Sequence, residues 1–427
     1  MTTRHFFSKV RNFIVLIIAG SALGLLALIL VHCIPLDKIT DHVQQSIPML
    51  QRDFQYNDAI EGYPASCVGT FTDCLMLEYC VYDSQEHSLL EQVMYMYRQE
   101  SSEGEAWTPG ISLVDYLSGK EQTREMEYAR YWHGYLVVLK PLLYVMSFNA
   151  IRILASAIQF LLVSIILMMC FQRKENLLGI GFTAAVPFLY FSNLYMSLSL
   201  SICFYILAVA VIIQLKWNEK ICQLQKYEEF FLMIGMSAAY FDLLTYPLIT
   251  LGFPLCICLY LNGENLKNNI KKMACYSISW FGGYIGFWAM KWVLTDILVG
   301  GSTIKDAFST ILQRTGSAEE QSRIAGLLTV VFKNLSAYTN WAFLPIILLI
   351  LAGTIVWIIR NAQHVKKKNI GCAVSILLVA FYPLAWFFFT QNHSEEHWLF
   401  TCKILSVSVF AFICAAGKLI YPIEKNK

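Results

Sequence analysis

Residues 13–34 read FIVLIIAGSALGLLALILVHCI, a run of 22 residues that contains no Asp, Glu, Lys or Arg. An α-helix of this length spans about 33 Å, which is enough to cross the hydrocarbon core of a bilayer. Basic residues precede the run at Arg4, Lys9 and Arg11, as they also do in signal peptides. However, the run is longer than the apolar region of a signal peptide, and residues 33–35 form a poor cleavage site. We therefore expect an uncleaved first membrane span.

Similar apolar runs recur along the whole chain. Of its 427 residues, 57% are hydrophobic and 15% are charged, whereas a soluble domain carries roughly 25% charged residues. The net charge of +2 gives no strongly basic field of the kind that attracts nucleic acid. We predict an all-α, polytopic bundle that forms one integral membrane domain over residues 1–427, with about ten spans. The predicted spans are residues 13–34, 151–171, 177–191, 196–215, 230–246, 248–261, 274–294, 341–359, 370–389 and 399–419.

The positions of Lys and Arg near the span ends predict the orientation of the bundle. If residue 1 lies in the cytoplasm, every segment predicted on that side contains Lys or Arg. The short segments predicted on the other side, near Asn193, Asp242 and Asn392, contain neither. Positively charged residues are enriched in the short cytoplasmic loops of membrane proteins. We therefore expect a multi-pass protein of the cell membrane with both termini in the cytoplasm.

Two long segments, residues 35–150 and 295–340, would then lie outside the cell. In the first, Ile39, Val43 and Ile47 repeat at helical spacing, which predicts a helix that lies along the membrane surface. The predicted cytoplasmic loops are too short to hold an active site. Any chemistry is therefore expected on the extracytoplasmic face.

The densest polar and aromatic cluster is residues 128–135, which read YARYWHGY. Arg130 and His133 stand among four aromatic side chains at the entrance to a predicted span. A guanidinium group binds phosphate through a planar fork of donors, and the rings offer a stacking surface, so the cluster could bind a lipid phosphate. The alternative is an interfacial aromatic belt in which the arginine reaches toward the headgroups.

Asp73 lies in the mostly apolar stretch FTDCLML of residues 71–77, which predicts a partly buried carboxylate. Desolvation raises the pKa of such a carboxyl group, which could then act as a general base toward a sugar hydroxyl. The alternative is a helix cap, because Thr72 and Asp73 suit the start of a helix through Leu77.

Asp242 stands at the outer end of a span that is otherwise uncharged. Ionisable groups at membrane depth are costly and are usually functional, so we expect Asp242 to bind substrate. A hydrogen-bonded interfacial cap is the alternative.

The segment QNHSEEH of residues 391–397 lies at another outer end, ahead of a span that contains Lys403. Its His393-x-x-Glu396-His397 pattern is found in a group of zinc proteases, because both imidazoles share one helix face. No acidic third ligand follows, so binding of an anion by His393 and Lys403 is the favoured interpretation. These motifs identify no cofactor, and binding of a divalent metal ion is an alternative.

In their order along the chain, several of these motifs resemble the GT-C class of membrane glycosyltransferases, in particular those of bacterial envelope-polysaccharide systems. The resembling positions are Thr72-Asp73, residues 130–135 with Pro141, Asp242 with Pro247, and Asn392-His393-Ser394. The likeness covers most of the chain at the level of layout, with one span followed by a large outer loop and then many further spans.

The resemblance implies an inverting transfer of a sugar from a polyprenyl-phosphate donor to a glycan or lipid acceptor. It implies Asp73 as the base and Arg130, His133, His393 and Lys403 as contacts to the lipid phosphate. Asp242 would then bind a sugar hydroxyl. Membrane lipids are the other expected partners.

Competing functions are a polysaccharide polymerase, a lipid-linked sugar transporter, a membrane scaffold without catalytic activity, and the zinc protease. A polymerase usually carries its large loop in the second half of the chain. A transporter would show polar residues at mid-membrane and internal symmetry.

Overall fold

The computed structural model describes residues 3–55, 58, 60–61, 63, 66–100, 109–120, 124–189, 196–315, 322–341 and 343–420. These residues form α-helices, short 3-10 turns and one small antiparallel sheet, so the predicted all-α class is confirmed. In the sheet, β1 (Tyr97–Glu100) pairs with β2 (Arg124–Glu127), with Tyr97 opposite Glu127.

Six helical segments in the described part of the chain are long and apolar enough to cross a membrane. The expected count of about ten spans is not confirmed, because three further apolar helices are too short by themselves: Leu136–Val145, Asn176–Leu189 and Ile249–Asn262. The six candidate spans are Phe7–His32, Phe148–Gln172, Leu198–Gln223, Leu344–His364, Lys367–Phe389 and Trp398–Ile420.

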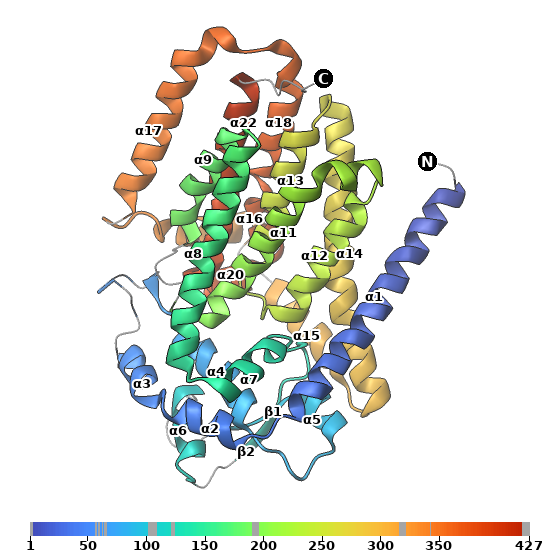
Figure 1. The fold of residues 1–427 in the computed structure, drawn as a ribbon, viewed down its shortest axis with the longest axis vertical. Helices are drawn as coiled ribbons and strands as arrows, with labels where there is room; N and C mark the ends of the chain where they lie inside the picture. The colour runs from blue at the N-terminus through green and yellow to red at the C-terminus, as the bar shows by residue number, and fades with distance from the viewer. Residues whose placement is uncertain are drawn as a thin grey trace.

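The bundle consists of helices from both halves of the chain (Figure 1). Figure 1 also shows α17 standing apart from the other helices, and none of its residues is buried. The bundle helices are α1 (Thr3–His32), α8 (Phe148–Gln172), α9 (Asn176–Ala185), α11 (Leu198–Gln223), α12 (Tyr227–Phe241), α13 (Ile249–Asn262), α14 (Leu266–Leu298), α17 (Leu344–Asn361), α18 (Ile370–Val379), α19 (Tyr382–Phe389), α21 (Trp398–Thr401) and α22 (Ser406–Ile420). The 3-10 turns beside them are η2 (Val186–Leu189), η3 (Ala362–His364), η4 (Lys367–Asn369) and η5 (Cys402–Leu405).

A second group of short helices gathers with the sheet at one end of the bundle (Figure 1). The start of α1 and the end of α22 lie at the opposite end. The short helices are α2 (Asp37–Gln44), α3 (Ile47–Gln55), α4 (Thr70–Val81), α5 (Leu89–Tyr95), α6 (Pro109–Leu117) and α7 (Leu136–Val145). We call this group, with β1 and β2, the end unit. The segment predicted outside after the first span therefore forms a folded unit.

Three helices from the second half of the chain are α15 (Thr303–Thr315), α16 (Arg323–Ser336) and α20 (Gln391–Glu396). The helix α16 is amphipathic, because it buries Gly326, Val330 and Asn334 and leaves Ile324 and Phe332 exposed.

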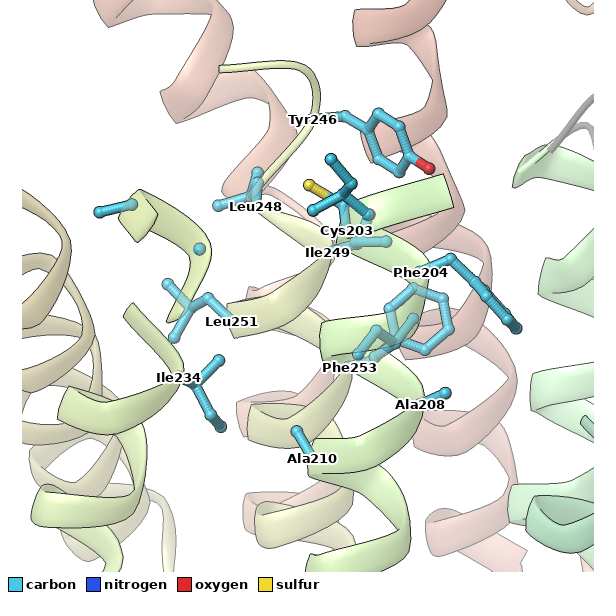
Figure 2. Packing of buried hydrophobic residues seen from close by; sticks show 14 of the residues in the cluster. Cys203, Phe204, Ala208, Ala210, Ile234, Tyr246, Leu248, Ile249, Leu251 and Phe253 are labelled. Atoms are coloured by element: carbon cyan, nitrogen blue, oxygen red, sulfur yellow. The ribbon is translucent and has the colours of Figure 1, made fainter. Parts of the chain in front are cut away.

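The bundle core lies where α11, α12 and α13 meet, and Figure 2 shows buried side chains of all three helices, among them Phe204, Ile234 and Phe253. Helix association inside a bilayer depends on close packing, because lipid tails are as apolar as the side chains. Glycine permits the closest approach, between α12 and α14. A Cβ atom on Gly235 would lie 2.1 Å from the carbonyl oxygen of Trp280, and one on Gly283 would lie 2.1 Å from that of Leu232. The two backbones can therefore touch only with glycine at these positions.

A buried group of three charges joins the end unit to the bundle. Arg152 of α8 forms an ion pair with Asp53 of α3, and its Nη2 atom lies 3.7 Å from Oδ2 of Asp73 on α4. Asp73 is also fully buried and accepts hydrogen bonds from the backbone N–H groups of Leu198 (3.0 Å) and Ser199 (2.9 Å). These N–H groups belong to the first turn of α11, where a helix has no backbone acceptors for them. The carboxylate of α4 therefore caps a membrane helix.

Replacing Arg152 with Met should destabilise the protein by about 3–5 kcal/mol, because the buried Asp73 would lose its counter-charge and Asp53 would keep only the exposed Arg52 at 3.5 Å. The thermal unfolding midpoint of the purified protein in detergent measures the effect. Arg173→Met is the matched control, since Arg173 pairs with the largely exposed Glu219 at 3.5 Å. Equal midpoints for the two variants would contradict the assigned role of Arg152.

Candidate functional site

A cavity of about 740 Å³ lies between α14, α15, α19 and α20, and residues 130–131 form part of its wall. Its lining is mostly apolar. Several lining side chains are also exposed on the surface of the molecule, so the cavity opens onto an apolar surface. These side chains are Phe281, Ile285, Val293, Phe308 and Phe389.

Two arginines and a histidine line the same cavity: Arg130, Arg314 and His393. Arg130 Nη1 donates to Oδ2 of Asp306 at 2.7 Å, and the guanidinium group lies 5.0 Å from the centre of the Tyr128 ring. The indole N–H of Trp292 on α14 donates to the backbone oxygen of Arg130 at 2.9 Å and holds this segment against the bundle.

Arg314 stands at the end of α15, and its Nη1 atom donates to the hydroxyl of Tyr131 at 2.5 Å. The Tyr131 ring packs edge-on against Trp288 of α14, with 5.6 Å between centroids. The sequence analysis did not select Arg314. A signal existed, because Ile304, Phe308 and Ile311 repeat at helical spacing ahead of it and line the cavity.

His393 on α20 is 4% exposed, and its Nε2 atom lies 2.9 Å from the carbonyl oxygen of Leu244. Because a carbonyl oxygen can only accept, Nε2 carries the proton and Nδ1 carries the lone pair. Nδ1 is buried and has no hydrogen-bond partner. Burial lowers the pKa of His393 to about 3, with smaller contributions from His397 and Arg314. The ring is therefore neutral and offers one acceptor atom.

His133 does not line the cavity. It is buried, at a φ of 54°, and its ring nitrogens contact the Tyr135 hydroxyl (2.9 Å) and the Tyr128 backbone oxygen (3.0 Å). Burial lowers its pKa to about 3, so it carries no charge that would attract phosphate. Its contacts hold the turn that presents Arg130. Lys403 is fully buried on η5 and is also absent from the cavity lining.

Asp73 and Asp242 are both absent from the cavity lining. Burial raises the pKa of Asp73, while Arg152 and the N–H groups of α11 oppose the rise. Asp242 follows α12 and accepts from the backbone N–H of Thr245 at 2.8 Å and from the Thr245 hydroxyl. This turn carries Leu244, which lines the cavity and binds His393. The structure therefore brings Arg130 and His393 together and leaves the other predicted residues outside the lining.

A metal-binding arrangement is not found in the described part of the chain. No group of three or more His, Cys, Asp or Glu side chains there is placed to hold an ion. The rings of His393 and His397 are 4.7 Å apart, but Nε2 of His393 already donates to Leu244. These two residues and Glu396 therefore do not fit a zinc site.

The fold defines an α-helical membrane protein, and its cavity has a mostly apolar lining that includes two arginines and a histidine. Comparisons with models of known protein families, with curated proteins and with solved structures gave no match. The assignment of a function therefore rests on the cavity itself.

Glu78 of α4 is a second unusual carboxyl group, although it lies outside the cavity lining. It is 3% exposed, and both carboxyl oxygens lack a hydrogen-bond partner. Burial raises its pKa from 4.5 to about 8, with Arg98 opposing the shift. The group is therefore mostly protonated at neutral pH.

Because its pKa is higher in the folded state, Glu78 stabilises the fold fully below about pH 4.5 and loses this contribution as the pH rises to about 8. The unfolding midpoint of the wild type should therefore fall more steeply than that of Glu78→Gln between pH 5 and 8. A thermal melt series of both proteins in one buffer set measures the difference, and parallel profiles would contradict it.

Proposed function

We propose that this protein is a membrane glycosyltransferase, which transfers a sugar from a polyprenyl-phosphate donor to a glycan or lipid acceptor. In this proposal the chain crosses the cell membrane about ten times, and the shorter apolar helices contribute to this number. Both termini lie in the cytoplasm, and the end unit with the cavity lies on the extracytoplasmic face.

The observation that carries the proposal is that Arg130 and Arg314 both line a cavity whose lining is otherwise mostly apolar. Such an arrangement suits a ligand with one anionic group and a long hydrocarbon chain. Guanidinium groups bind phosphate in a planar fork, and they keep their charge when they are partly buried. The exposed apolar side chains of α14 and α19 offer a path for the prenyl chain toward the lipid.

The proposed reaction is a single displacement. The acceptor hydroxyl oxygen forms a bond to C1 of the sugar, the bond from C1 to the phosphate oxygen breaks, and its electron pair stays on the lipid phosphate. Arg130 and Arg314 stabilise the charge of this leaving group. The hydroxyl proton passes to a base.

Two residues are candidates for this base. Asp73, expected from the resemblance, would first have to exchange its hydrogen bonds to α11. His393 lines the cavity and already carries an unprotonated nitrogen, the buried Nδ1, and a bound phosphate would raise its low pKa by opposite charge. We therefore favour His393 and assign Asp73 mainly to stability.

Undecaprenyl phosphate should bind more tightly than undecaprenol, and Arg314→Ala should weaken only the binding of the phosphate. A hydrogen bond to a charged group contributes about 1.5–3 kcal/mol, so the affinity should fall by about 10-fold or more. Quenching of tryptophan fluorescence measures binding, since Trp288 and Trp292 line the cavity.

Lys305→Ala is the matched control, because it removes an exposed cation from the same helix without touching the cavity lining. Equal affinities for the phosphate and the alcohol would contradict a phosphate site.

Transfer itself is tested with labelled polyprenyl-phosphate sugars and purified wild type, His393→Gln and Asp73→Asn. We expect His393→Gln to lose at least about 100-fold in rate, because general base catalysis contributes about 10²–10⁴-fold. Asp73→Asn should lower the thermal unfolding midpoint clearly and should change the transfer rate only slightly. Tight binding of every donor without any transfer would instead favour the lipid-linked sugar transporter.

A further inference from the structure

The helix α15 is tied to the end unit by the two arginines of the cavity. Asp306, in the first half of α15, forms an ion pair with Arg130, and Arg314, at the end of α15, binds Tyr131. Arg130 and Tyr131 both lie in the segment between β2 and α7. The apolar face of the same helix forms part of the cavity wall. An anion that binds the Nη1 groups of Arg130 and Arg314 therefore competes with contacts that hold α15 in place.

Asp306 forms one ion pair in the described part of the chain, with Arg130 at 2.7 Å. A carboxylate oxygen at this distance occupies one of the N–H donors of Arg130 that a phosphate oxygen can use. The Asp306 side chain is 49% exposed, so it can turn away into solvent without leaving a buried charge. The Asp306 carboxylate can therefore leave Arg130 and be replaced there by another anion.

The two ends of α15 are held by other groups. Asp296 of α14 accepts from the backbone N–H groups of Thr303 (2.8 Å) and Ile304 (3.2 Å). The side chain of Asn392 on α20 donates to the backbone oxygen of Gln313 at 2.8 Å. None of these contacts involves Arg130 or Arg314, so loss of the arginine contacts would free α15 from residues 130–131 without detaching it.

We propose that Asp306 occupies the phosphate position on Arg130 until a lipid phosphate displaces it, and that this exchange admits phosphate-bearing lipids to the cavity. The inference rests on the proposed function, because the ligand is the phosphate lipid assigned there. Asp306 is thereby a specificity residue: a lipid without an anionic group cannot replace a carboxylate on a guanidinium group, whereas a phosphate can.

The strength of the competition follows from the exposure of the pair. A half-exposed ion pair is weak, so removing the carboxylate should strengthen phosphate binding by about two- to fivefold. Asp306→Asn removes the charge and keeps the shape, and Asp306→Glu keeps the charge. Undecaprenyl phosphate and undecaprenol are the two probes, and tryptophan quenching of the full-length protein in detergent gives their affinities.

We expect Asp306→Asn to bind undecaprenyl phosphate about two- to fivefold more tightly than the wild type, with no change for undecaprenol. Asp306→Glu should bind both probes within about twofold of the wild type. Asp41→Asn is the control, because Asp41 is an exposed carboxylate of the end unit that lies outside the cavity lining. It should leave both affinities unchanged.

Unchanged or weaker phosphate binding by Asp306→Asn would overturn the inference. An equal gain for the phosphate and the alcohol would also overturn it, since the residue would then control access in general. The transfer assay separates this result from the proposed function. If the wild type transfers sugar but Asp306→Asn does not change phosphate binding, only the proposed exchange is wrong. If Asp306→Asn gives the expected gain in phosphate binding but no sugar is transferred, only the proposed enzymatic activity is wrong.

Discussion

The ion cluster of Arg152, Asp53 and Asp73 is the constraint on which the position of the end unit depends. A buried charge without a partner costs several kcal/mol, so the three groups can be buried only together. They come from α8, α3 and α4, and Asp73 in addition caps α11. The cluster therefore fixes two helices of the end unit on two helices of the bundle, at the level where the polar end of the bundle begins.

The segment that carries Arg130 is also held by hydrogen bonds to backbone atoms of the bundle. The indole N–H of Trp132 donates to the oxygen of Phe287 at 2.7 Å, and the N–H of Gly134 donates to the oxygen of Tyr240 at 2.9 Å. A Cβ atom at residue 134 would lie 2.6 Å from that same oxygen, so only glycine allows this approach. Contacts to α12 and α14 thus position one wall of the cavity, and α15 supplies the other.

Much of the fold could be predicted from the chain, because a membrane imposes simple rules on length and polarity. The run from residue 13 predicted α1, and the spacing of Ile39 and Val43 predicted α2, which buries both. The short apolar helix Ile249–Asn262 was also predicted, as residues 248–261, but it is too short by itself to count as a span, and its burial comes from packing that no local pattern reveals. The candidate site was predicted only in part: Arg130 and His393 line the cavity, but Arg314 comes from a surface helix whose position depends on its neighbours.

The sequence by itself determined the membrane class of the protein and its helical content. These follow from composition and from periodicity along one segment, which are local properties. Only the tertiary structure decided which charges meet: Asp73 caps α11 instead of its own helix, while Arg130 and Arg314 meet across 184 residues of chain at one cavity. Contacts between distant segments depend on how the helices pack. The sequence of one segment does not show which residues of another segment will lie against it.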